Sequence, residues 1–411
     1  MSAVLPPASP SCRASVYFNP WDEDFRANPY PFYAPLLAGP PLVIERFFPM
    51  VVAARYADAA AILADHRRYS SVAPKGPLLK ERFALFGEAA RVLFSDPPVH
   101  TRLRRLVSRA FTPRRVAALE PRVRQITREL LDRAAADGRF DAVAALANPL
   151  PIMIIAEMLG VPPQEYPVFK KWSDAVVQVD TVVPGHPIPQ TVYEAVEALR
   201  AYFAAEIARR RQTGADDLVS VLVSASEQGE EVLSAEELIA FVILLLLAGN
   251  ETTTNLIGNG MLALARHPES YARLRQHPEL IASAVEEMLR FDGPVQATVR
   301  YLGEETEFGG RLMPRETPVF VVLAAANRDP ARFARPEMFD IARKPNDHLA
   351  FGDGIHYCLG AALARLEATA AFSGVVRRFA RIELIEPASP LRYRGSYFVR
   401  GLSSLALAAQ G

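Results

Sequence analysis

Near its C-terminal end the sequence reads Phe351-Gly-Asp-Gly-Ile-His-Tyr-Cys-Leu-Gly360, and this stretch decides the fold. Glycines at positions 352, 354 and 360 flank Cys358, and a helical pattern starts directly after the last of them. Glycine lets the backbone come close to a flat partner and adopt positive φ. A cysteine at a helix N-terminus feels the helix dipole and accepts backbone N–H bonds, both of which favour its thiolate.

An anionic sulfur held in this way suits an axial haem ligand, because the thiolate pushes electron density through iron and assists O–O cleavage. A buried structural cysteine in a tight turn is the alternative. Three spaced glycines, a phenylalanine seven residues before the cysteine and a histidine two residues before it speak against that alternative.

The loop resembles the ligand loop of the cytochrome P-450 family, the haem-thiolate monooxygenases, which reads F-G-x-G-x-H-x-C-x-G. The likeness extends from about Asn19 over nearly the whole chain and is to the soluble bacterial branch. It implies a mainly α fold with small β-sheets: a triangular helical prism around a haem, with a long central helix. It also implies haem b (iron protoporphyrin IX) as cofactor, Cys358 as its metal ligand, and cofactor contacts from Phe351, Gly352 and Gly360.

Composition excludes several other classes of protein. Lys+Arg and Asp+Glu are equal at 46 each in 411 residues, which argues against a nucleic acid or an anionic membrane reached through bulk charge. Only two cysteines, Cys12 and Cys358, argue for a reducing compartment. The N-terminus lacks the features of a signal peptide, and the apolar run Leu238 to Gly249 is shorter than the ~20 residues of a membrane span. We expect a cytoplasmic monomer without a membrane anchor, with a disordered tail over 1–18 and a single domain over 19–411.

Hydrophobic periodicity predicts mostly helices, with a little sheet near both ends. A capping box, Ser234 with Glu237, starts a helix that no proline interrupts before Pro268, which makes it about 33 residues long. Residues 71–93 show no clear period and indicate a long structured loop. The other helices are expected at 28–39, 56–65, 97–111, several within 116–225, 269–276, 279–291 and 360–380, and the strands at 42–45, 50–53, 306–308, 311–313 and 317–323.

Midway along the long predicted helix stand Gly249, Glu251 and Thr252 in an apolar surrounding. Oxygen scission at haem needs protons while bulk water is kept out, and a hydroxyl backed by an acid supplies such a relay. We expect Gly249 to leave room for dioxygen. The resembled family carries [AG]-G-x-[DE]-T here, which implies catalytic roles for Glu251 and Thr252. The alternative is a threonine that bonds back within its helix and a glutamate in a structural salt bridge.

Positive side chains are expected to bind the two haem propionates, because carboxylates in a low-dielectric pocket need charge-assisted donors. His100 and Arg104 share one helix face by their i, i+4 spacing. The resemblance implies that this pair binds a propionate, with Arg300 and His356 as further partners. Each arginine taken alone is more often a solvated surface charge.

Glu287 and Arg290 match the E-x-x-R of the family, a buried ion pair. The family usually completes this pair with an arginine in a P-x-R-F segment, where this chain carries Met338. Arg335 or Arg343 are the two substitutes, and the sequence leaves the choice open.

The expected substrate-binding residues are all apolar, which favours a hydrophobic substrate of small to medium size. Packing in the core is the alternative for each of them. They are Leu78, Phe86, Leu244, Ala248, Val295, Ala297 and Phe398.

The resemblance implies a monooxygenase that inserts one atom of dioxygen into its substrate with electrons from a separate ferredoxin and ferredoxin reductase. A peroxide-driven or reductive haem-thiolate enzyme is one alternative, and a haem-based sensor is another. Small ferredoxins are commonly acidic, so we expect the donor to dock on Arg102, Arg105 and Arg109, which the helical wheel places opposite His100 and Arg104. The alternative is that these arginines are solvated or pair with carboxylates of the protein.

Overall fold

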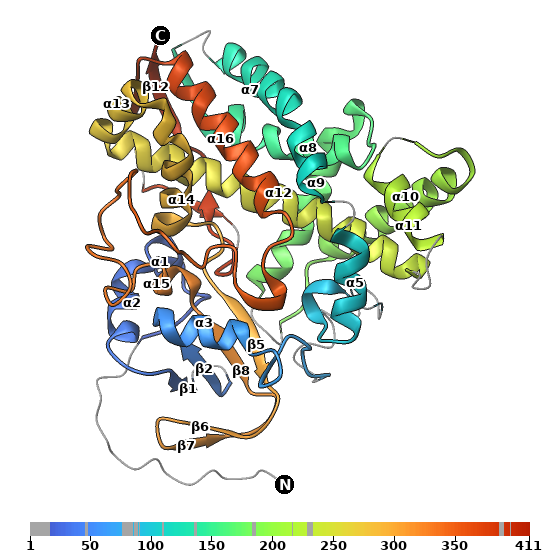
Figure 1. Ribbon diagram of the computed structural model, residues 1–411, viewed down its shortest axis with the longest axis vertical. Helices are drawn as coiled ribbons and strands as arrows, with labels where there is room; N and C mark the ends of the chain where they lie inside the picture. The colour runs from blue at the N-terminus through green and yellow to red at the C-terminus, as the bar shows by residue number, and fades with distance from the viewer. Residues whose placement is uncertain are drawn as a thin grey trace.

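The protein is described by a computed structural model over residues 17–45, 48–75, 85, 89, 91–108, 111–134, 138–182, 186–215, 217–227, 233–385, 390–394 and 396–411. Helices make up most of it. The largest sheet lies at the edge formed by the N-terminal segment, whereas strand β12 (Ala406–Gln410) lies at the opposite end, beside the C-terminus (Figure 1). The fold is mainly α with small sheets and a long central helix, as the sequence predicts. The helices are α1 Glu23–Ala27, α2 Tyr30–Leu37, α3 Tyr56–Ala64, α5 Val99–Ser108, α6 Pro113–Ala118, α7 Glu120–Ala134, α8 Pro149–Met158, α9 Tyr166–Val177, α10 Gln190–Thr213, α11 Leu218–Glu227, α12 Ala235–Arg266, α13 Pro268–Gln276, α14 Ile281–Asp292, α15 Leu323–Ala326 and α16 Ala361–Arg378.

The long helix α12 forms as the sequence predicts. Ser234 accepts a hydrogen bond from the backbone N–H of Glu237, whose side chain accepts one from the backbone of Ser234, so the capping box is complete. The helix runs through the middle of the structure and packs against α8, α10, α14 and α16 (Figure 1). It is long and apolar enough to cross a membrane, but 67% of its most apolar window is buried within the protein. Burial of this kind is typical of a central core helix.

The largest sheet has five strands in the order β1-β2-β8-β5-β3 and joins strands far apart in the chain. The pair β2–β8 is parallel and the other pairs are antiparallel. The strands β4, β12 and β9 make a second sheet, β10 and β11 a third, and β6 and β7 a fourth. The strands are β1 Leu42–Ile44, β2 Met50–Ala53, β3 Tyr69–Ser70, β4 Arg139–Asp141, β5 Thr298–Leu302, β6 Thr306–Phe308, β7 Arg311–Met313, β8 Pro318–Val321, β9 Arg381–Leu384, β10 Tyr393–Arg394, β11 Gly401–Leu402 and β12 Ala406–Gln410.

The N-terminal region differs from the expected tail at its inner end. Phe18 is only 2% exposed and packs edge-on against Phe25, Phe320 and Tyr397. Aromatic burial therefore ties the chain down from Phe18, inside the predicted tail 1–18. The rest of that tail, up to residue 16, lies outside the described residues, as does most of the predicted 71–93 loop.

A network of charged side chains surrounds Glu287 on α14. Arg290 donates two hydrogen bonds of 2.8 Å to the carboxylate of Glu287, and both side chains are 0% exposed. Arg343 donates to the same carboxylate at 3.1 and 3.2 Å, so it is the third member that the sequence left open. Arg335 contributes only its backbone carbonyl, which accepts a hydrogen bond from Arg343. Asn346 and the backbone N–H of Asp340 complete the set of donors to Glu287.

The Glu287→Gln variant should lose about 3–5 kcal/mol of unfolding free energy, because it leaves two buried guanidinium groups without their counter-charge. Urea unfolding of the intact protein measures this loss. The matched control is Glu383→Gln, whose partner Arg381 is 64% exposed and whose loss should be below about 1 kcal/mol. Equal losses in the two variants would contradict the structural role given to Glu287.

Candidate active site

The cysteine loop is built by close backbone contacts. The backbone N–H of Cys358 donates a 2.9 Å hydrogen bond to the carbonyl of Phe351, which closes the loop. Gly354 has φ +67°, and a Cβ there would stand 2.5 Å from the carbonyl oxygen of Leu63 in α3, so only glycine fits. A short 3₁₀ turn, Gly354–His356, then leads to Cys358 and to the start of α16 at Ala361.

Cys358 is a free and exposed cysteine at the N-terminus of α16. Protein atoms nevertheless surround the thiol on most sides, and this burial raises its pKa. The backbone N–H groups of Gly360 and Ala361 and the charges of Arg104 and Arg365 act in the opposite direction and lower the pKa. The helix start therefore favours the thiolate, as the sequence predicts. Burial of the thiol has the larger effect, so the pKa of Cys358 is raised overall. A cation bound to the sulfur would tip this balance towards the thiolate.

One face of α12 remains accessible although the helix is buried around it. Ala248 is exposed, and Leu244 and Thr252, one turn before and one turn after it, are partly exposed. Residues spaced by four lie on one helix face, so the three form a continuous accessible strip. Its small and apolar side chains can receive a flat ligand or an apolar substrate.

Gly249 follows Ala248 on α12 and lies at the contact between α12 and α8. A Cβ there would stand 3.2 Å from the side chain of Ile155 in α8. The glycine therefore lets α8 pack closely against α12, and the room that it leaves for dioxygen stays a prediction.

Thr252 and Glu251 show the contacts that the alternative reading proposed. The hydroxyl of Thr252 donates a 2.7 Å hydrogen bond to the carbonyl of Ala248. Glu251 is 4% exposed, and its Oε1 accepts a 3.1 Å hydrogen bond from the amide of Asn255. The Nε of Arg394, on β10, lies 3.8 Å from the same oxygen. Thr252 is the donor in its hydrogen bond to Ala248, so the oxygen of its hydroxyl can still accept a hydrogen bond from another group.

Four of the predicted cofactor-binding side chains converge. The rings of His100 and His356 lie 4.4 Å apart, and the positive charges of Arg300 and Arg104 act on His356. Burial, and then the charges of Arg300, His100 and Arg104, lower the pKa of His356 to about 3. Its Nε2 is 2.9 Å from the hydroxyl of Ser71.

The hydrogen-bond donors among these four side chains have few acceptors on the protein. Arg300 is buried, and within the described residues it donates hydrogen bonds only to the hydroxyl of Thr298 and the carbonyl of Val299. Burial lowers its pKa to about 10, although the charge of Asp96 acts in the opposite direction. The Nε2 of His100 is buried and has no hydrogen-bond partner in the part of the chain that the structure describes. Buried donors and charges of this kind are costly unless paired. Two carboxylates would satisfy them, so these residues fit the propionate edge of a haem.

The arginines on the opposite face of α5 do not all face solvent. Arg102 forms an ion pair with Glu237 at the start of α12, which contradicts the expectation that it is free. Arg105 is exposed. Arg109 lies outside the described residues, as do Leu78 and Phe86 of the expected substrate pocket.

The remaining predicted substrate residues divide between accessible and core positions. Leu244 borders a small cavity between α5 and α12, together with Leu103 and Phe241. Val295 forms a β-bridge with Val399, and Phe398 is partly buried against Phe320. Ala297 is 2% exposed in the aromatic cluster around Phe18, so for Ala297 the core-packing alternative holds.

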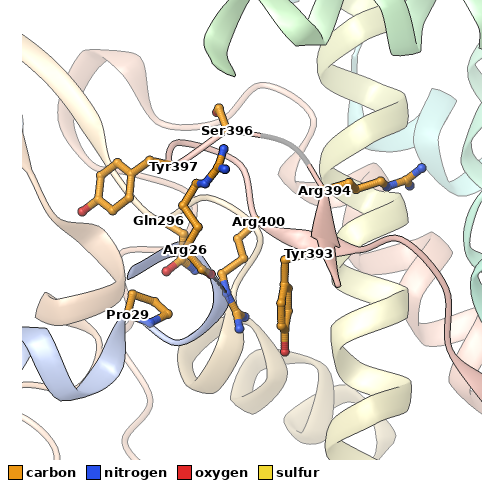
Figure 2. Close-up of a pocket in the computed structure, with 8 residues that line it drawn as sticks. All are labelled: Arg26, Pro29, Gln296, Tyr393, Arg394, Ser396, Tyr397 and Arg400. Atoms are coloured by element: carbon orange, nitrogen blue, oxygen red, sulfur yellow. Dashed lines mark hydrogen bonds between the residues drawn. The ribbon is translucent and has the colours of Figure 1, made fainter. Parts of the chain in front are cut away.

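Another cavity lies between the segment of α1 and α2 and the C-terminal hairpin, which is formed by β10 and β11 (Figure 2). Its volume is about 10 Å³, enough for one water molecule and too small for an organic substrate. The eight lining residues are Arg26, Pro29, Gln296, Tyr393, Arg394, Ser396, Tyr397 and Arg400.

Sequence reasoning missed three residues of the site: Ser71, Asn255 and Arg394. Ser71 stands in the stretch without periodicity and reaches His356 from a distant part of the chain. Asn255 follows Glu251 by four residues, and this spacing was a signal in the sequence. Arg394 reaches Glu251 only through the pairing of β10 with β11, for which the sequence carries no local signal.

Comparison with known proteins places these features in one family. The family model described as "Cytochrome P450" matches residues 46–392. The chain is 42% identical to the cytochrome P450 monooxygenase PikC of Streptomyces venezuelae over 94% of this chain and 92% of PikC. It is 38% identical to 6-deoxyerythronolide B hydroxylase of Saccharopolyspora erythraea, over 95% of this chain and 98% of the hydroxylase. The solved structure of the Bacillus subtilis polyketide synthase cytochrome P450 PksS superposes with a TM-score of 0.87 and 35% identity, over 96% of this chain and 100% of PksS.

The Arg300→Met variant should weaken haem binding and stabilise the apoprotein, because the same buried charge that binds a propionate is unpaired without it. Loss of one charged hydrogen-bonding partner costs about 1.5–3 kcal/mol, which corresponds to roughly a 10- to 100-fold faster release of haem. Haem transfer to apomyoglobin measures the release rate, and thermal unfolding of the apoprotein measures the stability.

The control for this experiment is Arg315→Met, at an exposed position next to the same sheet. It should change neither quantity. An Arg300→Met apoprotein that is less stable than the parent, with unchanged haem release, would show that Arg300 is a structural residue instead.

Proposed function

The chain belongs to the cytochrome P450 family of haem-thiolate monooxygenases, and we propose that it inserts one atom of dioxygen into a hydrophobic organic molecule with electrons from a separate ferredoxin and ferredoxin reductase. The observation that carries the proposal is the group of donors at the cysteine loop, buried His100 and Arg300 and partly buried His356. In the part of the chain that the structure describes, no carboxylate forms an ion pair with them, and Asp96 acts on His100 and Arg300 only through its charge. A sensor would need the haem alone, whereas this chain also has an acid and a hydroxyl beside the accessible strip of α12.

We infer that the thiolate of Cys358 would hold the haem iron and that Phe351, Gly352 and Gly360 would shape the loop around this cysteine. His100, Arg104, Arg300 and His356 would hold the two propionates. When bound, haem supplies the iron at which dioxygen is reduced and cleaved. The protein's own contribution is to hold the sulfur at the start of α16, to neutralise the propionates and to exclude bulk water.

Proton delivery is assigned to Thr252 and Glu251. Thr252 lies on the accessible strip, where its hydroxyl can hold a proton donor near a ligand. Glu251 is the adjacent acid, turned into the protein towards Asn255 and Arg394. Such a pair passes protons one at a time without opening the site to water.

The substrate is inferred to be hydrophobic because Leu244 and Ala248, the accessible part of α12, offer no charge to a ligand. Relatives named as hydroxylases of 6-deoxyerythronolide B and of vitamin D(3) support the oxidation of an organic molecule. We infer that the reaction takes place in the cytoplasm, where a ferredoxin system is available.

The Thr252→Ala variant tests the proposed chemistry. It should still bind substrate and consume NADH, but release hydrogen peroxide in place of product, because the hydroxyl no longer steers protons. Glu251→Gln should slow oxygen turnover, by about 10²-fold or more if general acid assistance is lost. Product, peroxide and NADH are measured together in one reconstituted assay.

Full coupling of NADH to product in Thr252→Ala would contradict the assignment. It would point to Thr253 or to a water molecule as the proton donor.

The electron donor is proposed to dock beside α5 and the start of α16. Arg105 is exposed there, and α6, which packs against α16, adds the exposed Arg114 and Arg115. Opposite charge speeds encounter with an acidic ferredoxin, and this effect falls with ionic strength.

The double variant Arg105→Glu with Arg114→Glu should therefore be reduced more slowly by ferredoxin and with a flatter salt dependence. Stopped-flow reduction at several salt concentrations measures both, and haem content and substrate affinity should be unchanged. The same rate and salt dependence as the parent protein would move the docking site elsewhere.

A further inference from the structure

The carboxylate of Glu251 is held loosely from two sides. Asn255 donates one hydrogen bond of 3.1 Å to its Oε1. The Nε of Arg394 lies 3.8 Å from the same oxygen, too far for a hydrogen bond, and this buried Nε has no hydrogen-bond partner in the part of the chain that the structure describes. The ion pair therefore lacks the hydrogen bond that would fix its geometry.

A second buried glutamate of the same protein shows what a fixed pair looks like. Glu287 receives two hydrogen bonds of 2.8 Å from Arg290, and both side chains are fully buried. The side chain of Arg394 is 23% exposed and that of Glu251 is 5% exposed, so this pair reaches solvent at its arginine. A rigid pair suits a structural role, whereas a loose pair with one end in water suits a group that moves and exchanges protons.

The position of Arg394 is set by a close approach of the C-terminal hairpin to α12. Arg394 stands opposite Gly401 in the β10–β11 register. A Cβ on Gly401 would stand 1.8 Å from the Oδ1 of Asn255, so only glycine allows the hairpin to come this close. Asn255 is also the residue that binds Glu251, and the hairpin therefore delivers Arg394 to the acid.

Arg394 has a second contact away from the acid. Its Nη2 donates a 2.7 Å hydrogen bond to the Oδ1 of Asn148, at the start of α8. Figure 2 shows its side chain crossing α12 and pointing away from the other residues of the cavity. The guanidinium is thus anchored to Asn148 while its Nε faces Glu251.

We propose that Arg394 is a positioning residue for proton delivery, which holds the carboxylate of Glu251 beside Asn255 and releases it to turn towards Thr252. The inference rests on the proposed function, in which Glu251 carries protons to Thr252. In each excursion Glu251 takes one proton from water and gives one proton to the Thr252 side, and it returns as the carboxylate to Arg394. No electron moves in this step. Breaking the ion pair is part of the barrier, so Arg394 limits the rate at which protons are supplied.

The test compares Arg394→Gln with Arg394→Lys, which keeps the positive charge. Oxygen consumption at saturating substrate and electron donor should rise about fivefold in Arg394→Gln, which corresponds to roughly 1 kcal/mol of lost ion pairing. The solvent isotope effect on this rate should fall at the same time. Both values should return towards those of the parent protein in Arg394→Lys. Arg392→Gln, an exposed position in the same segment, is the matched control and should change neither.

A readout independent of turnover is the infrared carboxylate band of Glu251, identified by subtracting the spectrum of Glu251→Gln. It should shift in Arg394→Gln and return in Arg394→Lys. An unmoved band, or an oxygen consumption rate that is unchanged or lower in Arg394→Gln, would overturn the inference.

The Glu251→Gln background separates the two levels of the proposal. If Glu251→Gln alone leaves oxygen turnover unchanged, the proposed role of the acid fails. If Glu251→Gln slows turnover but the Arg394→Gln effect persists in the double variant, the acid remains a proton carrier and only the role of Arg394 fails. Loss of the Arg394 effect in the double variant is the expected result.

Discussion

A buried guanidinium needs a negative partner, and the rest of the site depends on how this chain meets that need at Arg300. Among the described residues, Arg300 donates hydrogen bonds only to a hydroxyl and a carbonyl; burial and then the charge of Arg300 lower the pKa of His356 to about 3. His100 adds a buried nitrogen that has no hydrogen-bond partner in the same part of the chain. Burying these groups is unfavourable in the protein alone, and a ligand with two carboxylates would supply the missing negative charge and hydrogen-bond acceptors. Haem is such a ligand, and the cysteine loop lies next to the same cluster.

Two buried glutamates, Glu287 and Glu251, differ in how many hydrogen bonds hold their carboxylates, and this difference agrees with their different roles. Glu287 is enclosed by Arg290, Arg343 and a backbone N–H, which fixes α14 to the segment that carries Asp340 and Arg343. Glu251 is held by one amide and a loose arginine, on the helix that lines the site. Rigid charge pairing makes the scaffold, and loose pairing leaves an acid free to exchange protons.

The features that could be predicted from the sequence are those in which few residues act together over short distances. The capping box at Ser234, the Glu287–Arg290 pair and the glycine-flanked Cys358 all depend on neighbours within one or two helical turns. Strand β5 was missed because it exists only by pairing with β8 and β3. Ser71 and Arg394 were missed because they meet His356 and Glu251 across hundreds of positions or through a hairpin register. The close packing of Gly249 against Ile155 was missed because Ile155 lies on another helix.

The identity of the iron ligand is the central claim, and the carbon monoxide complex of the reduced protein tests it most directly. With Cys358 as the thiolate ligand, the ferrous complex should show the red-shifted Soret band of thiolate ligation, and Cys358→His should lose both this band and monooxygenation. A Cys358→His protein that kept the band would require Cys12 as the ligand and would contradict the assignment of the site.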